Sequence, residues 1–312
     1  MAYAVNYIFR KIWLTNEKII SPNLFKFAVE MCNNNFKGNN QEDAHEFIIF
    51  MIDILHEDLN KNIYKKTITE NEKEEKDEQL KYGLEWKKFL LRNKSILIDL
   101  FYGQFKSNIT CSICKNSVSN FYPFSTLSLN LNTEDNNHFK NKINNSNNKG
   151  NNNINSNKKN INHTTSLYEL FENLSSVEIL SDDDKWYCKI CDKKVKAFKN
   201  LEINYIPKIL IIQLNRFDKY NNKIEKKIEF PINNLDLSKY ILSYENNNKA
   251  KEFNLFGLIN HFGSLNFGHY TAICKNSINN KWYIFNDSVV EEIDDESDIV
   301  TNNAYLLFYR VN

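Results

Sequence analysis

Four of the six cysteines form two Cys-x-x-Cys pairs, Cys111 with Cys114 and Cys188 with Cys191. Two such pairs brought together supply four thiolates, which is the ligand set of a tetrahedral structural Zn²⁺ site. A site closed by four protein ligands keeps no position for a catalytic water. Two unrelated pairs of buried cysteines are the alternative. We predict zinc, because this spacing in a chain without a recognisable secretory signal favours a metal site over disulfides.

A second group of residues suggests nucleophilic catalysis. His269 follows a glycine at the start of a predicted strand, and the next predicted strand ends at Asn286 and Asp287. An imidazole and a side-chain oxygen on adjacent strands form the base and the orienting group of a nucleophilic triad. Alternation places Asn286 and Asp287 on opposite faces and does not say which one meets His269. A lone histidine beside a glycine is more often structural, and that alternative stays open here.

The chain offers no convincing nucleophile to this base. Cys274 lies five residues after His269 in the same predicted strand, so the two side chains point to opposite faces. Cys32 ends a helix, with no following helix N-terminus to stabilise a thiolate. The other four cysteines are assigned to zinc. We therefore expect the reactive thiol to lie outside this sequence.

The elements that position these residues follow from hydrophobic periodicity. Ser21 and Pro22 are expected to begin a helix, as N-cap and first helical residue. The predicted helices are Ala4–Leu14, Asn23–Met31, Gln41–Leu59, Glu85–Leu91 and Leu167–Leu174. The predicted strands are Gln104–Cys111, Ser117–Phe121, Leu127–Leu131, Val195–Ile203, Ile209–Phe217, Phe253–His261, Tyr270–Lys275, Lys281–Asn286 and Ala304–Arg310. Helices mostly precede strands, which indicates the α+β class.

Composition limits the classes of partner. Forty basic and 39 acidic residues give a net charge of +1, which argues against general affinity for nucleic acid or for an anionic membrane. No apolar run approaches the roughly 20 residues of a membrane-spanning helix. Within residues 141–162, 12 of 22 are Asn. Because such a tract buries little apolar surface, we expect residues 133–163 to be a disordered insertion.

Several motifs in order resemble the ubiquitin-specific protease family. They are Gln41–Phe47 (QEDAHEF), Leu55–Asn60 (LHEDLN), Phe101–Phe105 (FYGQF), Ile206–Phe217 (IPKILIIQLNRF), the His269 and Asn286 segments, and Ala304–Tyr309 (AYLLFY). The resemblance spans nearly the whole chain and implies one papain-like catalytic domain, residues 1–312, with a thumb, a palm and zinc-ribbon fingers. It implies a helical thumb at 1–100 and fingers with palm at 101–312.

The same resemblance assigns roles to residues. His269 would be the general base, Asn286 the third triad member and Asp287 a supporting neighbour. Asp43 and Glu46 would bind the basic, extended tail of ubiquitin, together with Gly268 and Tyr270 beside the loop that gates its channel. A solvated helix face is the alternative for the two acidic residues.

The family's cysteine box, which carries the nucleophile and an oxyanion-hole side chain, is absent from this sequence. We expect a chain truncated at its N-terminus, inactive alone, whose full form hydrolyses the (iso)peptide bond at the C-terminus of ubiquitin. The expected partners are ubiquitin and ubiquitinated proteins, the expected state is a monomer, and the expected location is the cytoplasm or nucleus. A module that binds ubiquitin without cutting it and a zinc-ribbon scaffold unrelated to ubiquitin are the alternatives.

Overall fold

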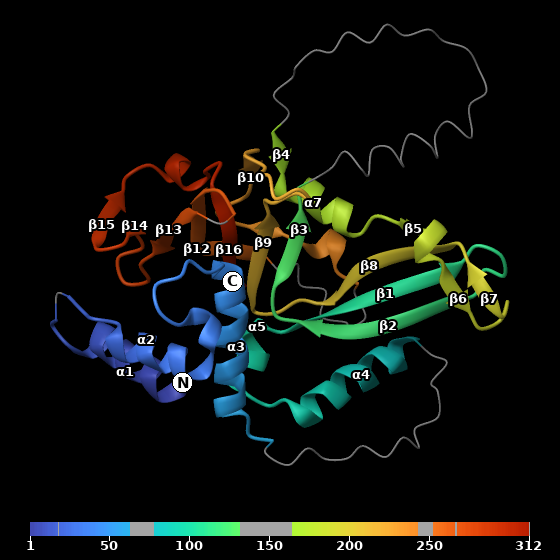
Figure 1. Ribbon diagram of the computed structural model, residues 1–312, viewed down its shortest axis with the longest axis horizontal. Coiled ribbons are helices and arrows are strands. Elements are labelled where there is room, and N and C mark those ends of the chain that lie inside the picture. Colours follow the sequence, from blue (N-terminus) through green and yellow to red (C-terminus); the bar gives the residue numbers. More distant parts are fainter. Residues whose placement is uncertain (18, 63–77, 132–163, 243–251, 266, 312) are drawn as a thin grey trace, which may run out of the picture.

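A computed structural model describes residues 1–17, 19–62, 78–131, 164–242, 252–265 and 267–311. The first three helices gather at one end, a large sheet lies behind them, and a long β-ribbon extends to the opposite side (Figure 1). The predicted α+β class is confirmed. The expected insertion at 133–163 lies outside the described residues. Among the residues that the structure describes, no helix has the length and apolarity to cross a membrane.

The helical part packs against the sheet through α3. Its helices are α1 (Ala2–Leu14), α2 (Asn23–Cys32), α3 (Ala44–Leu59), α4 (Glu78–Arg92) and α5 (Ile96–Phe101), with a short 3-10 turn, η1 (Asn34–Phe36). Ile52 of α3 and Leu97 of α5 are buried together with Ile211 of the sheet. This small cluster sets α3 against the strands that carry the candidate site.

Three predicted helices begin elsewhere in the structure: α1 begins at Ala2 and not at Ala4, α4 begins at Glu78 and not at Glu85, and α3 begins later than predicted. α3 begins at Ala44 rather than at Gln41, because Asp43 has an extended backbone and caps the helix with its side chain. For α2, Pro22 occupies the N-cap position that we predicted for Ser21, and Asn23 is the first helical residue. The Ser21 hydroxyl accepts only a long bond, 3.4 Å, from the amide of Asn23.

The large sheet has the strand order β15-β14-β13-β12-β16-β9-β3, with β11 (Leu235–Asp236) paired to β12 at one side. Its strands are β15 (Val289–Ile293), β14 (Trp282–Asn286), β13 (Gly268–Lys275), β12 (Glu252–Gly263), β16 (Ala304–Val311), β9 (Ile209–Asn215) and β3 (Leu127–Asn130). All neighbours are antiparallel except β3 and β9, which run parallel. The main core packs α7 (Leu167–Leu174) against this sheet.

The ribbon is a second sheet, of order β2-β1-β8-β5. β1 (Gly103–Cys111) leaves the body of the molecule and ends at the tip, where β2 (Ser117–Phe124) turns back. β8 (Ala197–Tyr205) and β5 (Glu178–Leu180) complete the sheet, and the hairpin of β6 (Trp186–Cys188) and β7 (Lys193–Val195) lies at the same tip (Figure 1). Because Lys196 separates β7 from β8, the single strand predicted for Val195–Ile203 is two strands.

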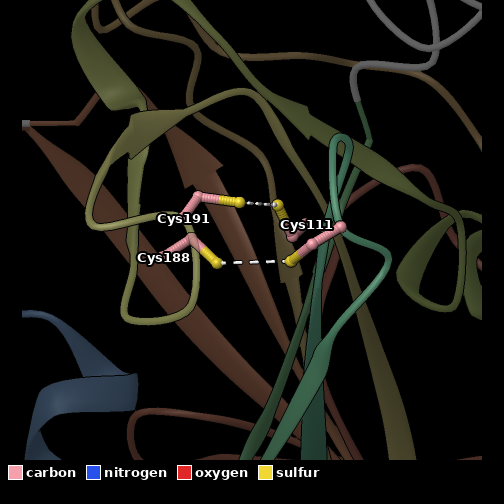
Figure 2. Close-up of side chains that lie close together, drawn as sticks. Cys111, Cys188 and Cys191 are labelled. Carbon is pink, nitrogen blue, oxygen red and sulfur yellow. Dashed lines mark hydrogen bonds between the residues drawn. The ribbon is translucent and has the colours of Figure 1, made fainter.

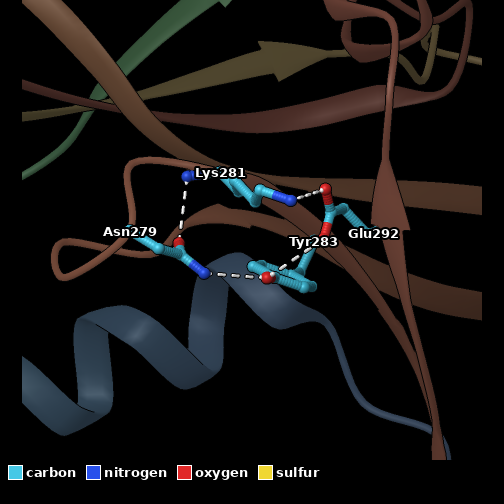
Figure 3. A network of polar contacts seen from close by, with 4 residues as sticks. All are labelled: Asn279, Lys281, Tyr283 and Glu292. Atoms are coloured by element: carbon cyan, nitrogen blue, oxygen red, sulfur yellow. Dashed lines mark hydrogen bonds and ion pairs between the residues drawn. The ribbon is translucent and has the colours of Figure 1, made fainter.

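The remaining described elements are short. They are β4 (Thr165–Ser166), β10 (Ile228–Glu229), η2 (Asp182–Asp184), η3 (Ser238–Tyr240) and η4 (Glu296–Ile299). At the outer edge of the large sheet, the hydroxyl of Tyr283 on β14 and the ammonium of Lys281 both contact Glu292 of β15 (Figure 3). Asn279 donates to the Tyr283 hydroxyl at 2.9 Å. This polar cluster fixes β15 to β14, the strand that ends at Asn286.

Candidate active site

The structure brings His269 and Asn286 together. His269 stands at the start of β13 and Asn286 at the end of β14, its neighbour in the sheet. The imidazole Nε2 lies 2.7 Å from the amide Oδ1 of Asn286. Since Oδ1 can only accept, Nε2 carries the proton and donates it. The lone pair of the neutral ring is then on Nδ1, which is available to take a proton from a nucleophile.

Asp287 has a different place. It begins the two-residue turn between β14 and β15, and its φ of 50° is in the left-handed region that Asn and Asp adopt more readily than most residues. The side chain is exposed. Strand periodicity did not say whether Asn286 or Asp287 contacts the imidazole. In the structure the contact is Asn286, and Asp287 lies one residue further along the chain.

A cleft of about 330 Å³ lies beside the start of β13. Glu42, Asp43 and Glu46 line one wall, and the other wall contains His261, Gly268 and Tyr270. The carboxylate wall would attract a basic ligand, and Glu46 is exposed there. The four residues that we predicted to bind substrate, Asp43, Glu46, Gly268 and Tyr270, all line this one cleft.

Gly268 has no space for a side chain. A Cβ at this position would lie 2.2 Å from Nε2 of His261 and 2.9 Å from the carbonyl oxygen of Phe262. On the other side, its amide donates to Oε1 of Gln41 at 2.9 Å. Sequence reasoning gave no role to Gln41 or His261. The glycine at position 268 was a signal in the sequence that another part of the chain approaches the backbone there. The residues that approach it could not be predicted, because they come from distant segments.

Asp43 is the N-cap of α3. Its Oδ1 accepts from the backbone amides of His45 at 2.7 Å and Glu46 at 3.0 Å. Its Oδ2 accepts from the hydroxyl of Tyr305 at 2.7 Å, and the hydroxyl of Tyr270 lies 3.4 Å away. An Asp followed three residues later by a Glu is the capping-box spacing, which could have located this helix start in the sequence.

An apolar groove of about 350 Å³ adjoins the site on the helix side. Phe36, Ala44 and Phe47 form its helical wall, and Ala272 and Phe285 of β13 and β14 form the sheet wall. Phe285 is 41% exposed, which is unusual for a phenylalanine in a sheet interior. This apolar surface, which is also lined by Tyr270, the residue after His269, is suited to contact a further polypeptide segment.

The four cysteines of the two pairs meet at the tip of the ribbon (Figure 2). All four sulfur atoms lie within 4.8 Å of one another, and the two cross-pair contacts are 3.8 Å for Cys111 with Cys191 and 3.6 Å for Cys114 with Cys188. A tetrahedron with metal–sulfur bonds of about 2.3 Å has sulfur–sulfur edges of about 3.8 Å. The arrangement therefore fits a tetrahedral metal ion.

The two pairs also share a backbone conformation. The residue after each second cysteine, Lys115 and Asp192, has a positive φ of 60° and 51°. The amide of Ile113 points at the sulfur of Cys111 at 3.4 Å, as expected for a thiolate that carries negative charge. Because the two turns have matching conformations and face each other, a metal site explains the four cysteines better than two unrelated pairs do.

The remaining cysteines do not complete a triad. Cys274 pairs with Tyr283 across β13 and β14, on the sheet face opposite to that of His269. Part of its side chain reaches the surface, but packing around the sulfur raises the pKa of the thiol by desolvation. Cys32 is exposed at the end of α2.

Comparisons with known proteins show the family to which the chain is related. The profile of the family described as "Ubiquitin carboxyl-terminal hydrolase" matches residues 1–309. Ubiquitin carboxyl-terminal hydrolase 2 of Bos taurus is 32% identical over 97% of this chain and 46% of its own length. Ubiquitin carboxyl-terminal hydrolase 4 of Saccharomyces cerevisiae is 30% identical over 93% of this chain and 31% of its own length. The chain thus spans less than half of these relatives.

Solved structures give the same result. The SAGA DUB module bound to monoubiquitin matches with a TM-score of 0.64 and 25% identity, over 93% of this chain and 53% of that chain. The module bound to ubiquitin aldehyde matches with a TM-score of 0.63 and 24% identity, over 100% of this chain and 65% of that chain. The papain-like fold predicted from the sequence motifs is confirmed. This chain belongs to the ubiquitin carboxyl-terminal hydrolase family.

Proposed function

We propose that this chain forms most of the catalytic domain of a thiol-dependent deubiquitinase, which hydrolyses the (iso)peptide bond at the C-terminus of ubiquitin. The observation that carries the proposal is the hydrogen bond of 2.7 Å between Nε2 of His269 and Oδ1 of Asn286. It holds the imidazole with Nδ1 directed away from Asn286, as a general base requires. Membership of the family and the ubiquitin bound to the similar SAGA module support ubiquitin as the substrate.

The nucleophile is proposed to come from a segment that precedes residue 1 in the full protein. The apolar groove of Phe36, Ala44, Phe47, Ala272 and Phe285 is also lined by Tyr270, the residue after His269, and it is the surface on which that segment would pack. Neither Cys32 nor Cys274 is placed to react, so the chain alone is expected to be inactive. A module that binds ubiquitin without cutting it is the second candidate, and it is favoured by the same lack of a reactive thiol.

The chemistry follows from the roles of the groups. Nδ1 of His269 takes the proton of the cysteine thiol, and the thiolate attacks the carbonyl carbon of the terminal glycine of ubiquitin. A carbon–sulfur bond forms, the carbon–nitrogen bond breaks, and the imidazolium gives its proton to the leaving amine. Water, deprotonated by the same imidazole, then hydrolyses the thioester and releases ubiquitin and the thiol. Asn286 keeps the ring in the required tautomer throughout.

The basic, extended substrate tail is proposed to lie in the cleft beside Gly268, where its basic residues would face Glu46. The ion at the four cysteines is proposed to be Zn²⁺, which would join the two turns at the ribbon tip and supply no catalytic chemistry. We propose a monomer located in the cytoplasm or nucleus, with 1–100 as thumb, 101–312 as fingers and palm, and Asp287 as a neighbour that supports Asn286.

The test uses the full protein that contains the upstream cysteine. It is expected to hydrolyse a ubiquitin–fluorophore conjugate, and cysteine→Ala in the upstream segment and His269→Ala should each abolish the activity. The 312-residue chain should bind ubiquitin in calorimetry without reacting with an electrophilic ubiquitin probe. Labelling of the short chain by the probe would contradict the upstream nucleophile, and a full protein that binds ubiquitin but never cleaves it would favour the binding module.

A further inference from the structure

Polar contacts join the segment before α3 to the sheet strands that carry the site. The hydroxyl of Tyr305, on β16, donates to Oδ2 of Asp43 at 2.7 Å. The hydroxyl of Tyr270, on β13, lies 3.4 Å from the same oxygen and 3.4 Å from the amide of Ala44. Two residues earlier, Gln41 accepts from the amide of Gly268 at 2.9 Å. All of these contacts lie around the cleft, and Gly268 directly precedes His269.

Most of the acceptor capacity of Asp43 is used. A carboxylate has about four lone-pair sites on its two oxygens. Two amides of the first turn of α3 occupy Oδ1, and the two tyrosine hydroxyls approach Oδ2. Glu46, in contrast, is exposed on the same wall of the cleft. An incoming basic side chain would therefore find a free carboxylate at Glu46 and a largely occupied one at Asp43.

The tyrosines remain donors at all physiological pH values. Tyr305 is 3% exposed, and desolvation followed by the bond to Asp43 raises its pKa far above the usual value. Desolvation and Asp43 also raise the pKa of Tyr270 to about 12. The Tyr305 hydroxyl accepts in turn from the amide of Gln213, on β9, at 2.9 Å. The carboxylate of Asp43 thus accepts hydrogen bonds from residues of the sheet and is less available to a ligand.

We propose that Asp43 is a positioning residue, whose carboxylate fixes the start of α3 against β13 and β16 and thereby sets the cleft lined by Gly268 and Tyr270, the two chain neighbours of His269. Charge recognition of the substrate tail then falls to Glu46. This inference rests on the proposed function, since the cleft matters to the reaction only if a peptide tail enters it. It differs from the sequence-based prediction, in which Asp43 and Glu46 both contact the tail.

The experiment compares matched variants of the full protein that contains the upstream cysteine. Asp43→Asn keeps a good helix cap and removes the charge that holds the hydroxyls. Tyr305→Phe removes the hydroxyl that donates the shortest hydrogen bond to Oδ2 of Asp43. The double variant, Asp43→Asn with Tyr305→Phe, measures the coupling between the two side chains. Tyr309→Phe is the structural control, because its buried hydroxyl on the same strand donates to the carbonyl of Pro231 at 2.6 Å, away from Asp43. Glu46→Gln is the control for charge.

We expect Asp43→Asn and Tyr305→Phe each to lower kcat on a ubiquitin–fluorophore conjugate roughly tenfold, because the loss of a charge-assisted hydrogen bond misplaces the reacting groups. The double variant should be no worse than either single variant. The dependence of KM on salt should be unchanged in Asp43→Asn and weaker in Glu46→Gln. Tyr309→Phe should lower the melting temperature while leaving kcat near the wild-type value.

Three results would overturn the inference: additive losses in the double variant, a weakened salt dependence in Asp43→Asn, or an equal loss of kcat in Tyr309→Phe. A wild-type protein that binds ubiquitin without hydrolysing it would instead contradict the proposed hydrolysis. In that case the same variants, compared by their Kd for ubiquitin, still decide the positioning role. Coupled losses of affinity in Asp43→Asn and Tyr305→Phe support it, and an unchanged Kd in Tyr305→Phe contradicts it.

Discussion

Nε2 of His269 and Oδ1 of Asn286 lie 2.7 Å apart, at the ends of two neighbouring strands. An amide partner orients the ring without placing a second charge beside it. In the proposed reaction, the imidazolium would therefore be stabilised by a neutral dipole, as in proteases with a Cys-His-Asn triad.

Asn286→Ala in the full protein should lower kcat by roughly tenfold or more, since the ring loses the hydrogen bond that sets its tautomer. His269→Ala should lower kcat further, by about 10²–10⁴-fold, because the general base itself is removed. The measurement is hydrolysis of a ubiquitin–fluorophore conjugate under saturating conditions. Asp287→Ala is expected to cost less than Asn286→Ala, and the reverse order would show that the triad has been assigned to the wrong side chain.

Zinc analysis of the purified chain should find about one ion per molecule. Cys188→Ser should remove the metal and lower the stability by several kcal/mol, because the two turns at the ribbon tip lose the ion that joins them. Elemental analysis and thermal unfolding measure the two effects. Cys274→Ser is the matched control, and it should keep the metal. A wild-type chain that binds no zinc yet melts at the same temperature in a chelator would contradict the site.

The half-buried His45 and the buried His261 should make the chain less stable below neutral pH. Desolvation lowers the pKa of His45 and of His261 below the value of 6.5 that both take when unfolded. The unfolded state therefore binds protons first, so the stability present above pH 6.5 is lost as the pH falls toward the folded-state values. Each proton taken up contributes a slope of up to about 1.4 kcal/mol per pH unit.

Urea unfolding between pH 7 and pH 5 measures this slope. Glu30 and Asp58, whose pKa values are lowered by hydrogen bonds, act only below about pH 4.5. The thiol of Cys111, whose desolvation is outweighed by backbone hydrogen bonds that lower its pKa to about 6, also contributes to the slope in this window. The histidines therefore account only for the difference in slope between the wild type and a variant that lacks them. The variant with His45→Gln and His261→Gln should show a shallower slope, even if it is less stable overall. An equal slope in the variant and the wild type would disprove the assignment.

Gly268→Ala should reduce both the stability and the affinity for ubiquitin, because the new methyl group would collide with the ring of His261 and the carbonyl of Phe262. Gly83→Ala is the control in α4, where no heavy atom lies within 4 Å of the added carbon. That change should raise the stability by about 0.5–1 kcal/mol through helix propensity. Calorimetry with ubiquitin and thermal unfolding compare the two. A Gly268→Ala variant with wild-type affinity would place the substrate elsewhere.

Strong local patterns in the sequence predicted much of the fold. α7 and the centres of the long strands follow from apolar residues at regular spacing, and the two Cys-x-x-Cys pairs come together as predicted. β15 was missed because its sequence, VVEEI, has exposed valines followed by two acids and gains its partner only from β14. The Asn-Asp-Ser turn before it was a usable signal for a two-residue hairpin.

The cleft could be predicted only in part. The motif that contains Asp43 and the one that contains Gly268 are readable, but their contacts with Tyr305 and Gln41 join segments more than 200 residues apart. No local pattern encodes such a pairing. For the same reason, the sequence placed Asp43 on a helix face, whereas its bond to Tyr305 makes it a cap that also reaches the sheet.

β16, the last strand in sequence order, lies between β12 and β9 in the interior of the large sheet. During synthesis on the ribosome, β9 and β12 are made long before the strand that joins them. Their inner edges must stay without their final partner until residues 304–311 have emerged, and such open edges invite aggregation. Chaperone protection of the nascent protein is therefore expected, and a chain that lacks residues 304–311 would have the sheet that carries His269 divided from the strands behind α3.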